Sequence, residues 1–178
     1  MRTIKPYQKL CVISKDLGGK MDIQIHEATP EDKKLAAVIR VVINSIPCFS
    51  DHIEAQRWTR SFVKSLLANP AYFILVAEIK QELVGFVIGS ILAGVYNLEW
   101  IGVLPIHRKK GIGKGLIARL EIILSQRKVR KIWCTVLDED RQCQENQAFF
   151  REVGFKKMCQ LGPHWYGYNC SLWQKCLN

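Results

Sequence analysis

The chain lacks any long apolar segment and any secretory signal. No apolar run reaches the ~20 residues that a membrane-spanning helix needs, and the apolar segments 72–77 and 83–92 have the length of strands. Residues 1–20 mix lysines with Pro6 and a Gly18-Gly19 pair, without an apolar core before a small-residue cleavage site. We therefore expect a cytoplasmic protein with no membrane partner, in which residues 1–20 are an N-terminal extension and residues 21–178 form one domain.

The chain also lacks paired cysteines. Its seven cysteines are odd in number, scattered along the sequence, and contain no C-x-x-C pair. Zinc sites and disulfide frameworks usually show tighter spacing. We expect reduced thiols in or near the core and no bound metal.

Acidic residues are few compared with basic ones. The chain has 26 Lys and Arg against 16 Asp and Glu, a formal charge of +10 and a pI of about 9.4. This balance favours an anionic partner such as a nucleotide-containing cofactor, a nucleic acid, a ribosome or an acidic membrane surface. The composition alone does not separate these partners, but the basic residues gather in 108–114 and 127–131.

The hydrophobic spacing predicts a single α/β domain. The first helix is expected to start at Thr29 as N-cap, with Pro30 in its first turn and Asp32 completing a capping box, and to end at Pro47. Together the patterns predict strands over residues 21–27, 72–79, 82–92, 94–103, 129–137, 155–161 and 165–173. They predict helices over residues 30–46, 50–68, 111–127 and 141–153. The order is β-α-α-β-β-β-α-β-α-β-β.

The most informative segment is 103–116. An apolar strand leads through a turn containing proline into an amphipathic helix that begins with Gly111, Gly113 and Gly115. Such a turn gathers unpaired backbone N–H groups and the positive end of a helix dipole, and glycines let a bulky anion approach. Nearby cations add to the positive charge (Arg108, Lys109, Lys110, Lys114). A pyrophosphate is the expected ligand.

Two common phosphate-binding motifs do not fit this segment. A P-loop needs Ser or Thr after its lysine, but Lys114 is followed by Gly115, and a dinucleotide-binding fingerprint needs glycine where Leu116 stands. The pattern that fits is Arg/Gln-x-x-Gly-x-Gly after a mid-chain strand, with Arg108, Gly111 and Gly113. A plain strand-to-helix turn with a solvated basic edge is the alternative.

This pattern resembles the signature of the GNAT acetyltransferase superfamily. Residues 98–103 are similar to the family's fourth strand, residues 146–155 to its "A-x-x-F-Y-x-x-x-G-F" helix end, and residues 52–58 to a stretch before the second strand in some members. The resemblance implies an α/β (α+β) fold. Its central sheet is mixed and mostly antiparallel, has about seven strands flanked by about four helices, and is splayed between the fourth and fifth strands.

The resemblance also implies acetyl-CoA as co-substrate. The backbone of residues 101–103 would pair with the pantetheine arm as a further strand would, and the amides of residues 109–115 would hold the pyrophosphate. The cofactor-binding residues implied in this way are Ile101, Gly102, Val103, Arg108, Lys109, Lys110, Gly111, Ile112, Gly113, Lys114, Gly115, Asn146 and Phe150.

The implied reaction is attack of an amine on a thioester, which needs a base because amines are protonated at neutral pH. Glu99 lies where several family members carry their proposed base. Strand alternation predicts that its side chain lies on the same face of the strand as Ile101 and Val103, and on the opposite face from Trp100. The alternative is a glutamate paired with a lysine. A backbone N–H near Val103 would stabilise the oxyanion.

The chain departs from the family pattern at Phe150, where members usually carry a tyrosine that serves the leaving thiolate. Tyr166, Tyr168, Cys143 or water are the candidates to replace it. Asn146 stands one turn later than the asparagine often seen on this helix, whose position aligns with Cys143. On the acceptor side, Asp51 and Glu54 are candidates to attract an ammonium group.

We therefore expect an N-acetyltransferase that acts, as a monomer or homodimer, on the primary amine of a small molecule or protein. The missing tyrosine leaves a catalytically silent acyl-CoA-binding module as the main alternative. Nucleic-acid binding is a third, weaker interpretation because no recognised motif supports it.

Overall fold

The computed structural model describes residues 22–46, 54–138, 141–164 and 167–177, and in these ranges the chain forms one seven-stranded sheet with the strand order β1-β2-β3-β4-β5-β7-β6. The strands are β1 (Ile23–Glu27), β2 (Tyr72–Ile79), β3 (Glu82–Leu92), β4 (Val95–Val103), β5 (Lys131–Leu137), β6 (Lys156–Pro163) and β7 (Asn169–Cys176). The helices are α1 (Leu35–Asn44), α3 (Glu54–Arg57), α4 (Arg60–Ala68), α5 (Ile112–Gln126) and α6 (Arg141–Glu152), with a 3₁₀ turn, η1, at Pro105–His107.

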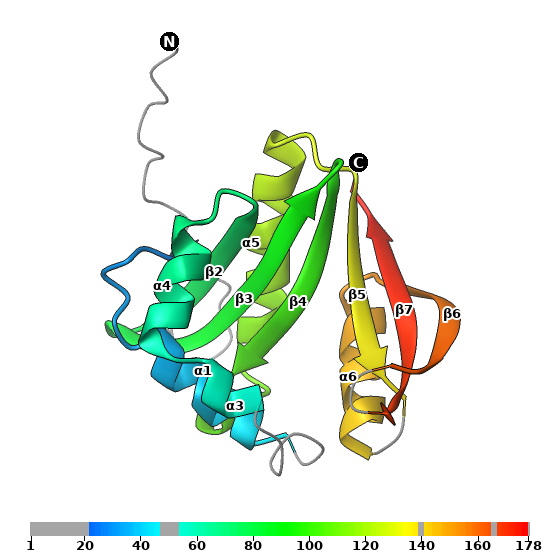
Figure 1. Ribbon diagram of the computed structural model, residues 1–178, viewed down its shortest axis with the longest axis horizontal. Coiled ribbons are helices and arrows are strands. Elements are labelled where there is room, and N and C mark those ends of the chain that lie inside the picture. Colours follow the sequence, from blue (N-terminus) through cyan, green and yellow to red (C-terminus); the bar gives the residue numbers. More distant parts are fainter. Residues whose placement is uncertain (1–21, 47–53, 139–140, 165–166, 178) are drawn as a thin grey trace.

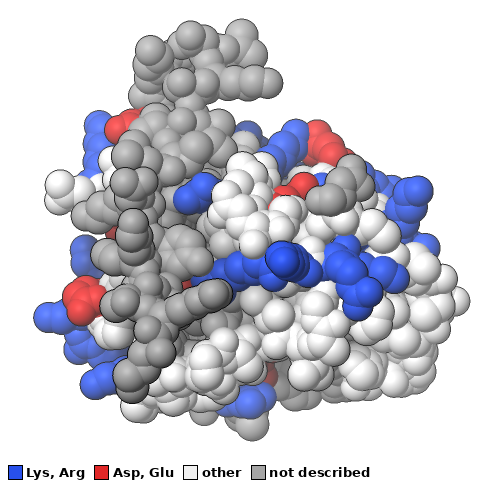
Figure 2. Space-filling model, turned by 90° about the horizontal axis from the view of Figure 1, so that it is seen from above, with Lys and Arg blue, Asp and Glu red and all other residues white. Residues whose placement is uncertain are grey.

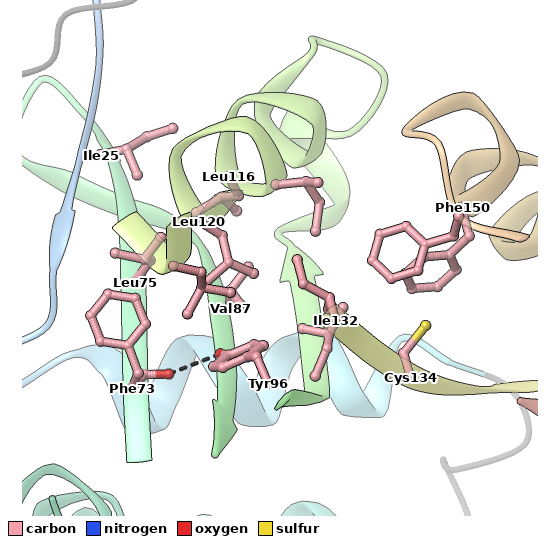
Figure 3. Close-up of a cluster of buried hydrophobic side chains, with 14 of the residues drawn as sticks. Ile25, Phe73, Leu75, Val87, Tyr96, Leu116, Leu120, Ile132, Cys134 and Phe150 are labelled. Atoms are coloured by element: carbon pink, nitrogen blue, oxygen red, sulfur yellow. Dashed lines mark hydrogen bonds between the residues drawn. The ribbon is translucent and has the colours of Figure 1, made fainter. Parts of the chain in front are cut away.

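Helices cover both faces of this sheet (Figure 1). On one face α5 and α6 bury a cluster that includes Leu75, Tyr96 and Leu120, shown in Figure 3. On the other face α1, α3 and α4 bury a second cluster around Ile39 and Phe86. None of the helices in the described ranges is long and apolar enough to cross a membrane.

The predicted splay between the fourth and fifth strands is confirmed. All neighbouring strands pair antiparallel except β4 and β5, which run parallel and pair only from Val95–Lys131 to Leu98–Cys134. Beyond Leu98 the two strands separate (Figure 1). Among the described strands, one edge of β4 is therefore left without a partner over residues 99–103.

The first helix begins five residues later than predicted. The contact expected of the capping box is present, since the Thr29 N–H donates to Asp32 Oδ2 at 2.6 Å. The Asp32 N–H in turn donates to the Thr29 carbonyl at 3.0 Å. These bonds close a separate turn over residues 30–34, and α1 starts only at Leu35.

The predicted helix over 50–68 is divided in its described part. The α3 helix ends at Arg57, and Thr59 has an extended backbone whose hydroxyl accepts from the Phe62 N–H at 3.2 Å, so Thr59 is the N-cap of α4. The last two strands lie further along than predicted, at 156–163 and 169–176 instead of 155–161 and 165–173.

Candidate functional site

A β-bulge in β4 determines where Glu99 points. Gly89 pairs with Leu98 and Ile88 pairs with Trp100, so Glu99 is an extra residue with no partner of its own on β3. Leu98 packs on the α5 side of the sheet, whereas Trp100 packs on the α1 side.

The predicted orientation of Glu99 is wrong for this reason. Ile101 and Val103 pack on the α5 side, but Glu99 bonds to Ser90, which lies opposite Tyr72 of the α1-side cluster. The side chain of Glu99 therefore lies on the same face of the sheet as Trp100. Strict alternation fails because a bulge places two successive residues on one face.

The Glu99 carboxylate is half-buried and held by a hydroxyl group. Ser90 Oγ donates to Oε1 at 3.0 Å, and the Tyr72 hydroxyl lies close enough for the charge of the carboxylate to act on it. Burial of the ring, and then the negative charge of Glu99, raise the pKa of Tyr72, so this hydroxyl keeps its proton. The alternative of a glutamate paired with a lysine finds no support in the described ranges, where no lysine forms an ion pair with Glu99.

The free edge of β4 presents backbone groups to the gap. The Leu104 N–H donates to the Val84 carbonyl of β3 at 2.8 Å. Because the bonds of an antiparallel pair alternate along a strand, the N–H and C=O groups of Ile101 and Val103 point the other way, towards β5. The Val103 carbonyl accepts from Arg108 Nε at 3.1 Å, whereas the Val103 N–H and both groups of Ile101 have no partner strand among the described residues.

The turn after β4 presents a second set of donors. Gly111, with φ of 80°, is the N-cap of α5, and Lys109 also has a positive φ of 59°. Within the part of the chain that the structure describes, the N–H groups of residues 109–114 donate to no backbone or side-chain acceptor, and the first bond of the helix runs from the Gly115 N–H to the Gly111 carbonyl. Free donors and the positive helix end thus meet at one place.

The cations around this turn make contacts within the protein. Arg108 donates to Ser45 Oγ at the end of α1 as well as to Val103, so its side chain fastens the turn to α1 and β4. Lys109 pairs with Glu145 of α6 at 3.1 Å, and Lys114 pairs with Glu152 of α6. Both pairs bridge α6 and the start of α5. They are well exposed, so each contributes little to stability.

One cleft of about 670 Å³ connects the gap between β4 and β5, the turn and the start of α6. It is lined by Glu99 and by all of the predicted cofactor-binding residues except Lys110 and Gly115. Lys110 is exposed outside the cleft. A Cβ at Gly115 would lie 3.2 Å from Ile25 Cδ1, so this glycine faces β1.

The α6 wall of the cleft is aromatic. Phe150 is 7% exposed and packs edge-to-face against Phe149 and Phe155, with ring centroids 5.4 and 5.2 Å away. A Cβ at Gly113 would lie 3.2 Å from the Phe149 ring, so the glycine allows α5 to approach this wall closely. Asn146 also lines the cleft.

Of the candidates to replace the missing tyrosine, Cys143 lines the cleft and Tyr168 does not. Tyr166 and Asp51 lie outside the described residues. Glu54 is 8% exposed and accepts from Trp58 Nε1 and Arg57, and it does not line the cleft.

Sequence reasoning missed the β5 wall. Cys134 and Thr135 line the cleft at the point where β5 leaves β4. Burial raises the pKa of the Cys134 thiol, so it stays protonated. The signal that could have found them is the splay itself, because the strand after the fourth strand must border the gap.

The chain matches the sequence model of the acetyltransferase (GNAT) family over residues 34–155. It belongs to this family. Among solved structures, the GNAT chain is similar to a presumed GNAT-family acetyltransferase from Desulfovibrio desulfuricans, with a TM-score of 0.74 and 20% identity over 88% of this chain and 99% of that one.

Two further similar structures are acetyltransferases. PaiA N-acetyltransferase from Thermoplasma acidophilum, in complex with coenzyme A, has a TM-score of 0.70 and 20% identity over 85% of this chain and 98% of that one. The ribosomal-protein-S18-alanine N-acetyltransferase from Escherichia coli has a TM-score of 0.66 and 16% identity over 88% and 94%. No curated protein matches the chain at a significant level.

Proposed function

We propose that this GNAT protein is an acetyl-CoA-dependent N-acetyltransferase that transfers the acetyl group to a primary amine of a small molecule or protein. One observation carries the proposal: the free edge of β4, the Glu99 carboxylate and the residues 109 and 111–114, whose N–H groups are unpaired within the described ranges, all border the same cleft. A cytoplasmic location, which the sequence predicts, stays a prediction.

The residues present fit acetyl-CoA, which supplies an acetyl group activated as a thioester. The N–H groups of residues 109–114 and the positive end of α5 would hold the pyrophosphate. Ile101 and the Val103 N–H would pair with the pantetheine amides in the place of a fifth strand. Phosphate oxygens would compete with Glu145 and Glu152 for Lys109 and Lys114.

Glu99 would take the proton that the ammonium group must lose, directly or through water. Ser90 fixes the orientation of its carboxylate and leaves it able to accept. A backbone N–H near Val103 would donate to the oxyanion as the amine attacks the carbonyl carbon. An amine acceptor is in keeping with the similar Escherichia coli structure, which is that of an alanine N-acetyltransferase.

Phe150 cannot donate a proton to the departing thiolate, and coenzyme A leaves tolerably as a thiolate. Cys143, which lines the cleft, or water would supply the proton. The phenylalanine at position 150 also favours the second candidate function, a catalytically silent module that binds acyl-CoA as a ligand.

Turnover separates the two functions. The purified protein is mixed with acetyl-CoA and a panel of primary amines, polyamines, aminoglycosides and peptide N-termini, and released thiol is measured. An enzyme releases thiol only with a suitable amine. Saturable acetyl-CoA binding that raises Tm, without thiol release for any amine, would instead identify the silent module.

A further inference from the structure

Outside the cleft, three side chains from three different elements bring possible metal ligands together. His26 on β1, Asp32 in the turn before α1 and Glu78 near the end of β2 each offer one ligand atom, and these atoms lie within 4.8 Å of one another. All three side chains are half-buried, and none of them lines the cleft.

The histidine presents the nitrogen that a metal would need. His26 Nδ1 lies 3.0 Å from the Glu27 carbonyl, which can only accept, so Nδ1 carries the proton. In neutral histidine the other nitrogen, Nε2, then holds a lone pair, and it lies 3.6 Å from Glu78 Oε2. A lone pair facing carboxylates is an arrangement that a cation stabilises.

The three residues His26, Asp32 and Glu78 form a triad, and contacts outside this triad orient the ligands in the way that is usual at metal sites. Histidine ligands typically donate their second N–H to a carbonyl, and carboxylate ligands accept further hydrogen bonds. His26 does the first, and Asp32 does the second through the Thr29 N–H at 2.6 Å. Neither contact uses another member of the triad.

We propose that His26, Asp32 and Glu78 bind a first-row divalent transition metal ion such as Zn²⁺ or Co²⁺. One imidazole and two carboxylates favour such ions over Mg²⁺ and Ca²⁺, which prefer oxygen ligands alone. Zinc bonds of about 2.0–2.2 Å place neighbouring ligand atoms roughly 3.5 Å apart. The separation between His26 and Glu78 meets this value, and the remaining ligand atoms need to move inward by about an ångström.

Because of where the triad lies, a bound ion would link separate elements of the fold. It would join the turn that leads into α1 to the edge of the sheet at β1 and β2. The α1 helix contributes Val42 to the cleft, and Ser45, directly after its end, contacts Arg108. Bound metal would therefore stabilise the fold from outside the proposed acetyl-CoA site.

The test uses the full, metal-free chain and does not depend on acetyl transfer. Zn²⁺ is titrated by calorimetry, and Tm is measured with and without it. We expect saturable binding of one ion per chain at the triad and a rise in Tm. His26→Gln and Glu78→Gln should each weaken binding by more than the roughly 10–100-fold that loss of an outer-shell partner costs, while the exposed control His164→Gln should not.

Two outcomes would overturn the site. The seven cysteines could also bind metal, and Co²⁺ reports this through a thiolate-to-cobalt charge-transfer band, which should be absent from the saturated triad. Its presence, together with unchanged affinity in His26→Gln, would place the ion on cysteines. An equal rise in Tm with Mg²⁺ would show a general effect of charge, without a role for the imidazole.

Discussion

Among single residues, Glu99 combines accessibility with fixed orientation. The bulge places its carboxylate beside Trp100 on the α1 side, and the hydroxyl group of Ser90 holds it there. Because Glu99 also lines the cleft that the β4 edge borders, it can reach a proton on an amine entering from that side.

If Glu99 is the base, Glu99→Gln will lower turnover at neutral pH by roughly 100-fold or more. The loss should shrink at alkaline pH, where the amine loses its proton without help. Acetyl-CoA affinity should change little, because the turn and the edge of β4 are intact. Steady-state rates across pH, together with calorimetric binding of acetyl-CoA, provide the measurement.

The matched control is Glu82→Gln, an exposed residue at the start of β3 that should leave the rate unchanged. Glu99→Asp should retain part of the activity because it keeps the carboxylate. A pH–rate profile of Glu99→Gln identical in shape and height to that of the original chain would remove Glu99 as the base.

The contribution of the Tyr96 hydroxyl can be tested through the stability of the folded protein. It is fully buried, and its hydroxyl donates to the Phe73 carbonyl at 2.9 Å, as Figure 3 shows. Tyr96→Phe removes this buried hydrogen bond and should lower the free energy of unfolding by about 0.5–1.5 kcal/mol. Urea unfolding at neutral pH measures this loss.

The same variant should change the dependence of stability on alkaline pH. Burial, and then the charge of Glu99, raise the pKa of Tyr96 well above its usual value. The unfolded chain loses this proton near pH 10 while the folded chain keeps it, so Tyr96 stabilises the fold fully below that pH and less above it. Unfolding measured at pH about 7 and about 11 should show a smaller alkaline loss in Tyr96→Phe, and an equal loss would contradict the assignment.

Among the elements, the turn before α5 could be predicted because its constraint is local. Positive φ at Gly111 favours glycine, and the spacing of Gly111 and Gly113 is visible in the sequence. The element order followed from the hydrophobic spacing, and the splay followed from the resemblance that this turn supports.

Other features depend on contacts that local sequence does not show. The bulge at Glu99 depends on how β3 and β4 pair, so alternation alone gave the wrong face. The break at Thr59 depends on an N-cap inside an otherwise apolar helical pattern. Cys134 borders the cleft only because β5 leaves β4 at that point.

Two glycines of α5 give a matched test of the cleft. Cβ atoms at Gly113 and Gly115 would each meet a neighbour at 3.2 Å, but the first meets Phe149 in the cleft and the second meets Ile25 of β1. Both substitutions by alanine carry the same gain in helix propensity. Gly113→Ala should weaken acetyl-CoA binding by about tenfold, or 1.4 kcal/mol, and Gly115→Ala should not.

Titration of acetyl-CoA followed by calorimetry measures both affinities. Gly113→Glu adds bulk and negative charge at the proposed pyrophosphate site and should abolish binding. Undiminished affinity in Gly113→Glu would refute the assignment of the turn.

At the scale of the whole molecule, α5 separates the two basic clusters. Its 15 residues span about 22 Å, with residues 108–114 at its start and residues 127–131 after its end. Figure 2, seen from above, shows a row of Lys and Arg side chains at the end of the molecule where α5 ends. The second cluster therefore lies away from the proposed pyrophosphate site, and its charge is not explained by acetyl-CoA.

Because the two basic clusters are separate, two double variants should differ in their affinity for acetyl-CoA. Lys109→Glu with Lys114→Glu places acids against Glu145 and Glu152 beside the turn, and should weaken acetyl-CoA binding and reduce its dependence on salt. Lys128→Glu with Arg130→Glu makes the same change of charge in exposed residues at the far end of α5, and should leave affinity within about twofold. Acetyl-CoA titrations at low and moderate salt measure both.

The same pair of variants tests nucleic-acid binding against acetyl-CoA binding. If the chain bound RNA or DNA through its basic surface, the Lys128 and Arg130 variant would lose that affinity while keeping its affinity for acetyl-CoA. Equal losses of acetyl-CoA affinity in both double variants would mean that total charge, and not the turn before α5, attracts the ligand. Because the two variants have the same net charge, position alone can make them differ.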